Sequence, residues 1–299
     1  MIIDGSNLSH RSFQKFENLK TPSGEKSGLI YGFIRSLHAY IVRFKPTYVI
    51  VTFDTKQSKS SNFRNNLLGG YKGHRKNISM DYESFSYQTR VVKKILKYLN
   101  IPFVWDSKGL GHESDDYIGY YTGQHMGKSI VVSSDKDFCQ LIDENTRIFN
   151  PFKETILNKH NCMEVMGYSP EECVDYLCLL GDKSDDIPGY YGMGPVKIRK
   201  FLDEFGTIEN FLSNPDNTFK GIDYDGLQDL YKRNKTLIDL KVAMEKYPVD
   251  KIPIKYSKHN SIDKEKLEKL FNSYSLQFFR SETFLEPFNK LKRWENQRK

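Results

Sequence analysis

Nine acidic residues follow predicted strands or open predicted helices in this 299-residue chain, and each lies beside an apolar run. They are Asp4, Asp54, Glu113, Asp115, Asp116, Asp135, Asp137, Asp182 and Asp185. The whole chain carries a net charge of +7, so the body around these carboxylates is more basic still. An acidic pocket in a basic protein suits divalent cations held against a polyanion. The pattern therefore favours metal-dependent cutting of nucleic acid as the first hypothesis.

Strand-like apolar runs alternate with helix-like segments over the first half of the chain. Apolar spacing predicts strands over residues 1–3, 48–53, 101–105, 129–134 and 147–149, and helices over residues 28–44, 82–99 and 114–121. We interpret residues 4–7 as a turn. The alternation predicts an α/β fold with a mostly parallel central sheet flanked by helices. Asp4, Asp54 and Asp135 then fall at carboxyl ends of strands, where such sheets bind ligands.

The second half of the chain changes to a helical pattern. Helices are predicted over residues 170–180, 195–205, 226–244 and 264–274, with a connector over residues 248–260. We therefore divide the chain into an α/β core, residues 1–180, and a helical region, residues 181–299. The basic and aromatic tail within residues 246–299 either packs and frays or binds a replication partner, and we favour packing.

Cysteine spacing and hydropathy indicate the cellular compartment in which the protein is expected. Cys139, Cys162, Cys173 and Cys178 show no C-x-x-C spacing, so we expect core thiols of a reduced compartment and neither a zinc site nor disulfides. The chain opens on strand-like residues, which argues against a signal peptide. No apolar stretch approaches the ~20 residues of a membrane span. We expect a soluble, cytoplasmic protein without membrane contact.

A basic run lies within residues 56–76 and contains no acidic residue between its first and last lysine. Its members are Lys56, Lys59, Arg64, Lys72, Arg75 and Lys76. Such a run is most often a solvated face, but Phe63, Tyr71 and Tyr82 in and near it favour contact with nucleic acid.

Each acidic segment taken singly has an ordinary explanation, as a strand-end turn or as the charged first turn of a helix. Gathered at one sheet edge, the carboxylates would cost several kcal/mol in repulsion and desolvation unless cations neutralise them. Ligation by oxygen alone favours Mg²⁺ or Mn²⁺ over zinc. Two groups of carboxylates would hold two or more ions, an arrangement that supports in-line displacement at phosphorus.

Three blocks carry a resemblance to a known family. They are residues 71–75 (Tyr-Lys-Gly-His-Arg), residues 134–141 (Ser-Asp-Lys-Asp-Phe-Cys-Gln-Leu) and the segment 181–194. The chain resembles the 5′-nuclease (flap endonuclease) family over roughly residues 1–245. That family includes the 5′→3′ exonuclease domain of bacterial DNA polymerase I and free-standing bacteriophage 5′ nucleases. No polymerase domain follows, so the free-standing enzymes are the closer likeness.

The resemblance implies a PIN-like fold with a helical arch at about residues 56–95 and a helix-hairpin-helix at about residues 186–205. It implies one metal group formed by Asp4, Asp54, Glu113, Asp115 and Asp116. It implies a second group formed by Asp135, Asp137, Asp182 and Asp185. The departures are small, since Asp186 stands where the family usually has Asn and Ser114 where Ala is usual.

The resemblance also implies roles for basic and glycine residues. Lys72 and Arg75 at the base of the arch would stabilise charge on the phosphate, and Tyr71 would stack on a displaced base. The alternative is a basic loop that contacts the backbone non-specifically. In the hairpin, Gly192, Gly194, Lys197 and Lys200 would bind a duplex phosphate. The family often binds a monovalent cation such as K⁺ there.

The expected function is a structure-specific 5′ nuclease that acts by a two-metal mechanism in primer removal. Its partners would be DNA with 5′ flaps or RNA–DNA primer junctions and a single-strand binding protein or polymerase, with the chain a monomer in a bacterial or phage-infected cell. Two rivals stay open: a PIN-type ribonuclease and a non-catalytic branched-DNA binding protein. The hairpin argues against the first rival, and the intact carboxylates argue against the second.

Overall fold

A computed structural model describes the chain except for residues 55–61, 74–79, 124–126, 249–253, 255–260 and 293–299. The chain divides into two units built from discontinuous segments. Unit 1 comprises residues 1–54, 79–107 and 252–299, and unit 2 comprises residues 55–78 and 108–251. The expected division at residue 180 separates two continuous segments, whereas each of these units combines segments from several parts of the sequence.

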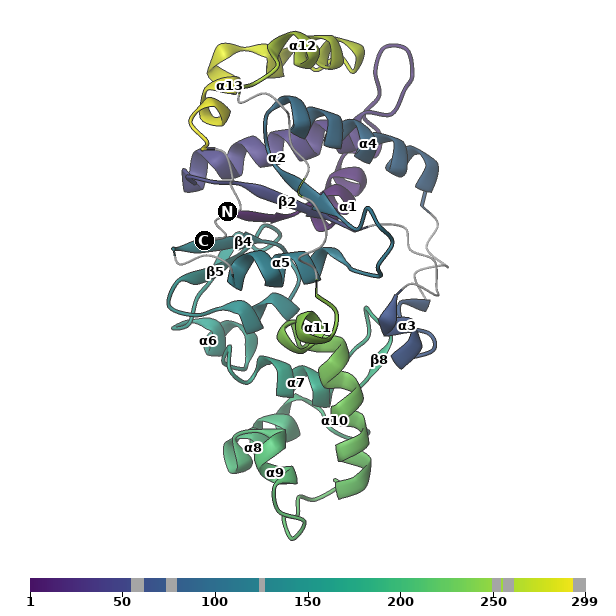
Figure 1. The fold of residues 1–299 in the computed structure, drawn as a ribbon, viewed down its shortest axis with the longest axis vertical. Helices are drawn as coiled ribbons and strands as arrows, with labels where there is room; N and C mark the ends of the chain where they lie inside the picture. Colours follow the sequence, from purple (N-terminus) through teal and green to yellow (C-terminus); the bar gives the residue numbers. More distant parts are fainter. Residues whose placement is uncertain (55–61, 74–79, 124–126, 249–253, 255–260, 293–299) are drawn as a thin grey trace. The chain divides into compact units, whose positions relative to one another are not determined.

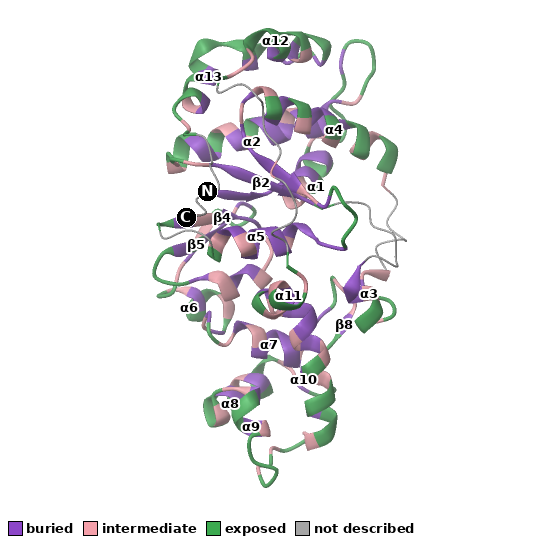
Figure 2. Ribbon diagram, viewed as in Figure 1, coloured by how far each residue is buried: buried purple, intermediate pink, exposed green. Residues whose placement is uncertain are grey.

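The strands of unit 1 are β1 (Ile2–Asp4), β2 (Ile50–Phe53) and β3 (Phe103–Trp105). They run parallel in the order β3-β2-β1, with Ile3 opposite Val51 and Val51 opposite Phe103. Burial colouring shows β1 and β2 as buried throughout (Figure 2). Continuous apolar runs form such strands because helices cover both faces of a parallel sheet. The predicted parallel arrangement is confirmed for these strands.

The helices of unit 1 are α1 (Gly5–Lys15), α2 (Gly28–Phe44) and α4 (Tyr82–Tyr98). Helix α2 has the predicted bounds. The turn predicted at residues 4–7 is wrong, because α1 begins at Gly5. The Asp4 side chain accepts a hydrogen bond from the Asn7 N–H at 3.0 Å and so caps this helix. Aspartate favours turns and helix N-caps alike, which is why the local residues misled the prediction.

The described part of the tail packs on unit 1. It forms α12 (Lys264–Ser273), a 3₁₀ turn η3 (Gln277–Arg280) and α13 (Glu282–Asn289), with α12 and α13 beside α2 and α4 (Figure 1). Phe279 stacks on Tyr31 with ring centroids 5.7 Å apart, and Phe284 stacks on His38 at 4.2 Å. Packing of the tail is therefore confirmed up to residue 292. Most of the connector at 248–260 lies outside the described residues.

The α/β part of unit 2 contains β4 (Ser129–Val132), β5 (Thr146–Asn150) and β6 (Thr155–Leu157). Strands β4 and β5 are parallel, and β6, which the sequence pattern did not predict, returns antiparallel to β5. Helix α5 (Ser114–Gly123) begins where predicted, and a 3₁₀ turn η2 (Asp137–Leu141) follows β4. The short helix α3 (Phe63–Leu67) belongs to this unit too.

Unit 2 also contains a series of helices after residue 160 (Figure 1). They are α6 (Cys162–Met166), α7 (Cys173–Leu180), α8 (Pro195–Phe205), α9 (Ile208–Leu212), α10 (Tyr224–Ile238) and α11 (Leu240–Lys246). All four cysteines are buried free thiols, as predicted. Within the described ranges, no helix has the length and apolar character needed to cross a membrane.

The single helix predicted over residues 226–244 is in fact two helices that meet at Asp239. This residue is extended, with ψ of 107°, and its side chain accepts from the Lys241 N–H at 2.9 Å. The Gln140 side chain binds both sides of the break. Its Nε2 donates to the Ile238 carbonyl at 3.0 Å, and its Oε1 accepts from the Leu240 N–H at 2.9 Å. A side chain distant in sequence therefore replaces the helical hydrogen bonds that the break removes.

A close backbone approach shapes the loop that carries the last acidic block. The short strands β7 (Gly181–Asp182) and β8 (Ile187–Pro188) pair antiparallel. A Cβ on Gly181 or on Gly189 would lie 2.3 Å from a backbone atom, so both positions require glycine. Asn234 of α10 ties this loop down, because its Nδ2 donates to the carbonyls of Cys178 at 3.0 Å and Pro188 at 2.9 Å.

Replacing Asn234 with alanine should lower the free energy of unfolding by about 1–3 kcal/mol, because two carbonyls at a buried site lose their donor. Urea denaturation of the metal-free protein measures the change. Gln228→Ala, an exposed position on the same helix, is the control and should change the free energy of unfolding by less than about 0.5 kcal/mol. Equal effects of the two substitutions would contradict the tethering role of Asn234.

Candidate metal centre and nucleic-acid interface

The two acidic residues of unit 1 lie at one edge of its sheet. Asp4 ends β1 and Asp54 follows β2, and these strands are adjacent and parallel. Asp4 is buried and caps α1, whereas Asp54 is exposed and its N–H donates to Ser6 Oγ at 2.7 Å. The predicted gathering of these carboxylates at the carboxyl ends of the strands is found.

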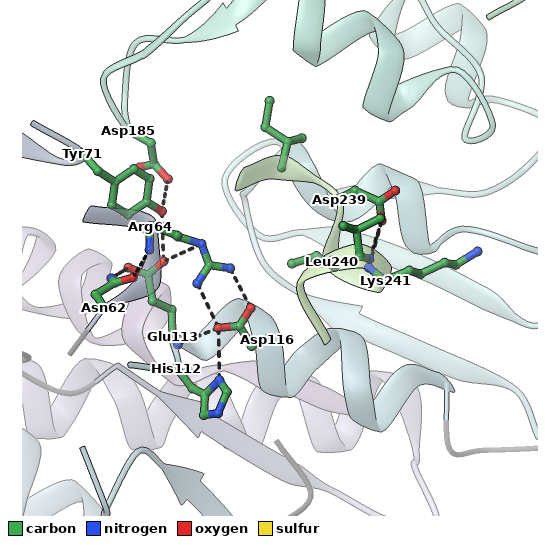
Figure 3. A network of polar contacts seen from close by, with 12 residues as sticks. Asn62, Arg64, Tyr71, His112, Glu113, Asp116, Asp185, Asp239, Leu240 and Lys241 are labelled. Carbon is green, nitrogen blue, oxygen red and sulfur yellow. Dashed lines mark hydrogen bonds and ion pairs between the residues drawn. The ribbon is translucent and has the colours of Figure 1, made fainter. Parts of the chain in front are cut away.

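In unit 2, Glu113 is surrounded by groups from the segment 62–72 (Figure 3). Its Oε1 accepts from Asn62 Nδ2 at 3.1 Å. Its Oε2 accepts from the Tyr71 hydroxyl at 3.0 Å and from Lys72 Nζ at 2.7 Å. Burial alone would raise the pKa of Glu113, but the Lys72 ammonium and the Arg64 guanidinium lower it to about 2. Glu113 is therefore ionised and accepts three hydrogen bonds.

Arg64 is a buried cation that the sequence pattern did not single out. Its Nη1 donates to Asp116 Oδ2 at 3.1 Å and its Nη2 donates to Oδ1 at 2.6 Å. Asp116 Oδ2 also accepts from the Glu113 N–H at 2.9 Å. The only sequence signal for this role was the position of Arg64 in the basic run. That signal suggested a solvated or DNA-facing side chain, whereas the arginine is an internal partner of a carboxylate.

Lys72 joins Glu113 to the last acidic block. Its Nζ lies 3.6 Å from Asp185 Oδ2, and its N–H donates to the Asp185 carbonyl at 3.0 Å. The Lys72 backbone has a φ of +53°, a left-handed conformation that costs a non-glycine residue about 1 kcal/mol or more. The contacts to Asp185 and Glu113 hold it there. Tyr71, expected to stack on a base, is buried, and its hydroxyl also reaches Asp185 Oδ2 at 3.0 Å.

The second acidic group lies in one neighbourhood of unit 2. The Asp137 N–H donates to Asp135 Oδ1 at 3.0 Å, and Lys136 Nζ lies 3.2 Å from Asp182 Oδ2. Ser184 Oγ donates to Asp182 Oδ1 at 2.6 Å. Asp137 Oδ1 is buried and has no hydrogen-bond partner among the residues that the structure describes.

The ionisation of this group reflects burial and mutual repulsion. Burial raises the pKa of Asp137 well above its usual range, and the Asp135 and Asp182 carboxylates raise it further. Burial and the charges of Asp185 and Asp182 likewise raise the pKa of Asp135. For Asp182, burial acts in the same direction, but Ser184 and Lys136 lower its pKa below the usual value. One carboxylate therefore has an internal counter-ion, whereas its neighbours lack a sufficient one.

These residues fit divalent cations in their donor set, which is carboxylate oxygen throughout. Within the described part of the chain, no three carboxylate, imidazole or thiol groups stand close enough to enclose an ion as they are. Lys72 and Lys136 occupy Glu113 and Asp182 instead. Asp137 Oδ1 has no hydrogen-bond partner in the described chain, and the raised pKa of Asp137 indicates that nearby cations do not fully offset its charge. Asp115 lies in the first turn of α5.

A glycine-rich loop precedes α8 in unit 2. Gly192 has a φ of +76°, which favours glycine, whereas Gly194 has an ordinary φ of −101° and caps α8. A Cβ on Gly194 would meet nothing within 4 Å, so the conformation of the chain itself favours glycine at Gly192 and not at Gly194. Lys197 and Lys200 are exposed on α8. The pattern missed Tyr191, whose side chain at the tip of the loop is 97% exposed. Arg75 lies outside the described residues.

Comparison with known families agrees with this arrangement. The family model "5'-3' exonuclease, N-terminal resolvase-like domain" matches residues 1–167. The model "5'-3' exonuclease, C-terminal SAM fold" matches residues 168–260. The chain belongs to the 5′-3′ exonuclease family. It is thus a nuclease, and the predicted fold, a mostly parallel sheet flanked by helices with a helical C-terminal region, is confirmed.

Relatives match this 5′-3′ exonuclease over most of its length. The 5′-3′ exonuclease of Aquifex aeolicus is 32% identical over 275 residues, which span 90% of this chain and 91% of that protein. A DNA polymerase I of Caldicellulosiruptor bescii is 30% identical over 225 residues, 72% of this chain and 25% of that protein. The chain thus corresponds to about a quarter of the polymerase.

Solved structures share the fold at low sequence identity. The bacteriophage T5 flap endonuclease in complex with DNA and metal ions has a TM-score of 0.68 at 20% identity, covering 96% of this chain and 98% of that one. The catalytic core of Rad2 in complex with a DNA substrate has a TM-score of 0.55 at 18% identity, covering 96% of this chain and 92% of that one. At these identities the likeness concerns the fold alone.

Replacing Asp137 with asparagine should stabilise the metal-free 5′-3′ exonuclease near neutral pH. The folded pKa of Asp137 lies above the unfolded value of about 3.9, so the folded state binds the proton more tightly. Stability is therefore lost as the pH rises through this window, and the uncharged variant escapes that loss. Urea denaturation in EDTA should show the variant as the more stable protein near neutral pH, with the difference disappearing below about pH 4.

We expect the addition of Mn²⁺ to reverse this order, because only the wild-type protein retains the Asp137 carboxylate as a candidate ligand. Asp229→Asn, at an exposed position of α10, is the matched control and should show neither effect. A wild-type protein that is the more stable of the two in EDTA at neutral pH would refute this account of Asp137.

Proposed function

We propose that this chain is a structure-specific 5′ nuclease, a flap endonuclease and 5′→3′ exonuclease that cuts branched or RNA-primed DNA. The observation that carries the proposal is the network in which Lys72 bridges Glu113 and Asp185. The network places two carboxylates, which can bind divalent cations, beside the Lys72 ammonium, which can bind a phosphate. Family membership supports the reaction class. The DNA-bound phage and Rad2 structures support the substrate class.

We assign divalent cations, Mg²⁺ or Mn²⁺, to two carboxylate groups. Asp4, Asp54, Glu113, Asp115 and Asp116 form the first group, and Asp135, Asp137, Asp182 and Asp185 form the second. Bound ions of this kind lower the pKa of water and neutralise charge on a transferring phosphoryl group. The phage structures that contain metal ions, zinc in one of them, support the binding of divalent cations, whereas the choice of Mg²⁺ or Mn²⁺ rests on the all-oxygen donor set. We assign a K⁺ ion to the hairpin before α8 by family resemblance.

The protein's own groups orient and neutralise the scissile phosphate. Lys72 is held in a strained backbone conformation beside two carboxylates, so its ammonium is already in place when a phosphate arrives. Arg75 would add a second cation, and Tyr71 would leave Glu113 to stack on a displaced base. Lys197 and Lys200 would bind the duplex through its phosphates.

The cellular role that we propose is removal of RNA primers and flaps during replication. The DNA polymerase I relatives support a place beside a polymerase. A single-strand binding protein is a second expected partner, and we expect the chain to act as a monomer. The buried free thiols suit a reduced compartment, the cytoplasm of a bacterial or phage-infected cell.

Two other functions are less well supported. A PIN-type ribonuclease would not explain the glycine-rich loop and exposed lysines of α8. A non-catalytic branched-DNA binding protein would not explain Asp137, a buried carboxylate oxygen without a partner in the described chain. Replacement of such carboxylates by neutral residues would stabilise a protein that only binds DNA.

A cleavage assay tests the proposal and separates it from both alternatives. A duplex with a labelled 5′ DNA flap, the same duplex with an RNA flap and a single-stranded RNA are each incubated with the protein in Mg²⁺ or in EDTA. We expect Mg²⁺-dependent cutting near the flap junction that leaves a 3′-hydroxyl. Cutting of the single-stranded RNA alone would favour the ribonuclease, and binding of the flap without cutting would favour the binding protein.

Lys72→Ala should slow the chemical step more than it weakens flap binding. The side chain faces groups that would surround the scissile phosphate, whose charge distribution changes in the transition state. Single-turnover cleavage at saturating enzyme measures the step, with Lys183→Ala, an exposed lysine of the same unit, as the control. An unchanged single-turnover rate for Lys72→Ala would make this lysine a mere backbone contact.

The double variant Lys197→Ala/Lys200→Ala should weaken binding to flaps that have a duplex region. The loss of two phosphate contacts should flatten the salt dependence of the affinity by up to about two units of slope. The single-turnover rate at saturating enzyme should fall much less. Lys264→Ala/Lys269→Ala, which removes two exposed lysines of α12, is the matched control. Equal salt slopes for the wild type and the α8 variant would rule out a duplex-binding role.

A further inference from the structure

We propose that Asp116 is the counter-ion of Arg64 and not a metal ligand, and that Arg64 is a positioning residue for Glu113. This inference rests on the proposed function and revises one member of the first carboxylate group. The remaining carboxylates of that group keep their assignment. The proposal follows from the geometry, burial and connections of a single ion pair.

The geometry leaves Asp116 little to offer a metal ion. Arg64 binds both of its oxygens in a two-pronged pair, Nη2 to Oδ1 at 2.6 Å and Nη1 to Oδ2 at 3.1 Å (Figure 3). Oδ2 accepts a further bond from the Glu113 N–H at 2.9 Å. Such a planar pair matches the fork of a guanidinium and is among the stronger hydrogen-bonded pairs in proteins.

Burial makes this pair costly to break. The side chains of Arg64 and Asp116 are each 2% exposed. Removal of one member would leave the other as an uncompensated buried charge, whereas replacement of both by neutral groups of similar shape is often tolerated. A divalent ion that displaced Arg64 from Asp116 would leave the guanidinium buried without its two-pronged partner.

Asp116 and Asp137 differ in how many hydrogen bonds their carboxylate oxygens already accept. Asp137 is half-buried, and its Oδ1 atom is buried and has no hydrogen-bond partner in the described chain. Asp116 has strong donors on both oxygens. Glu113 also accepts three hydrogen bonds, but one of its donors is Lys72, whose side chain is 18% exposed. The donors of Asp116 are a guanidinium that is 2% exposed and a backbone N–H, so they are harder to displace.

The pair acts on Glu113 through two contacts. Asp116 Oδ2 holds the Glu113 backbone N–H, and Arg64 Nε lies 4.0 Å from Glu113 Oε2. The buried Arg64–Asp116 pair therefore contacts both the backbone and the carboxylate of Glu113. Residues that orient a metal ligand in this way typically change metal affinity by about 10–100-fold when mutated. Arg64 thus sets the affinity of Glu113 for an ion without touching the ion.

A double-mutant cycle tests the inference with Mn²⁺ alone and no DNA. The variants are Arg64→Gln, Asp116→Asn and the two combined, and Mn²⁺ binding is measured by calorimetry and by electron paramagnetic resonance. We expect each single change to weaken Mn²⁺ binding about tenfold. The double variant, which restores charge balance, should bind more tightly than either single variant. If Asp116 is a ligand, the double variant will bind no better than Asp116→Asn, and the inference fails.

Two further measurements keep general destabilisation apart from positioning. Urea denaturation of the same variants should show that the double variant regains part of the free energy of unfolding that each single variant loses. The double variant therefore still tests the inference if a single variant fails to fold. Arg199→Gln breaks another two-pronged pair of the unit, with Glu172, and should leave Mn²⁺ affinity unchanged. Loss of Mn²⁺ binding in Arg199→Gln equal to that in Arg64→Gln would overturn the positioning role.

The conservative variant Arg64→Lys gives a last readout. A lysine keeps the charge but cannot form the two-pronged pair, so we expect Mn²⁺ affinity between those of Arg64→Gln and the wild type. If Arg64→Lys binds Mn²⁺ no more tightly than Arg64→Gln, the positive charge at this position does not support Mn²⁺ binding, and the positioning role proposed for Arg64 is wrong. Flap cleavage by the wild type reports separately on the proposed function, so failure of the cycle in an active nuclease rejects this inference alone.

Discussion

Carboxylates in the acidic groups of unit 2 lie close enough to repel one another, and the cations and donors around them are arranged to offset that repulsion. Burial and neighbouring charge raise the pKa of Asp137, whereas Lys72 and Arg64 hold that of Glu113 at about 2. The chain therefore uses its own cations as partial counter-ions, with Lys136 on Asp182 as a further case. Internal ammonium groups keep part of the site ionised in the absence of metal. In the proposed function, divalent ions supply the positive charge that these internal cations do not.

Side-chain amides and glycines hold the carboxylate-bearing loops of unit 2. Gln140 Nε2 donates to the Asp137 carbonyl at 2.8 Å and also bridges the break between α10 and α11. Asn234 anchors the strand pair that carries Asp182, where Gly181 and Gly189 allow the backbones to meet. Each device satisfies buried backbone groups that no regular element reaches. These contacts fix the positions of the carboxylates, because strands β7 and β8 contain only two residues each and form few hydrogen bonds of their own.

Regular elements could be predicted where local pattern and tertiary packing agree. Helices α2 and α8 have the predicted bounds, because apolar spacing and terminal residues point the same way. Helix α1 was missed since Asp4 and the residues after it favour turns as well as helix N-caps. The break at Asp239 was missed because Gln140, which compensates it, lies far away in sequence. The buried role of Arg64 was missed for the same reason, as charge composition does not reveal which cation faces inward.

Residue order along the chain was enough to predict the parallel α/β class, the family resemblance and the carboxylates at strand ends and helix starts. Local patterns place Asp4 after one apolar run and Asp54 after another, and the pairing of β1 with β2 then brings both to one edge of the sheet. The pairing of carboxylates with internal cations is visible only in the folded chain. Arg64 reaches both Asp116 and Glu113, while Asp137 retains a buried oxygen without a partner in the described chain. The physical reason is that desolvation and charge pairing act over a few ångströms in space between residues that lie far apart along the chain.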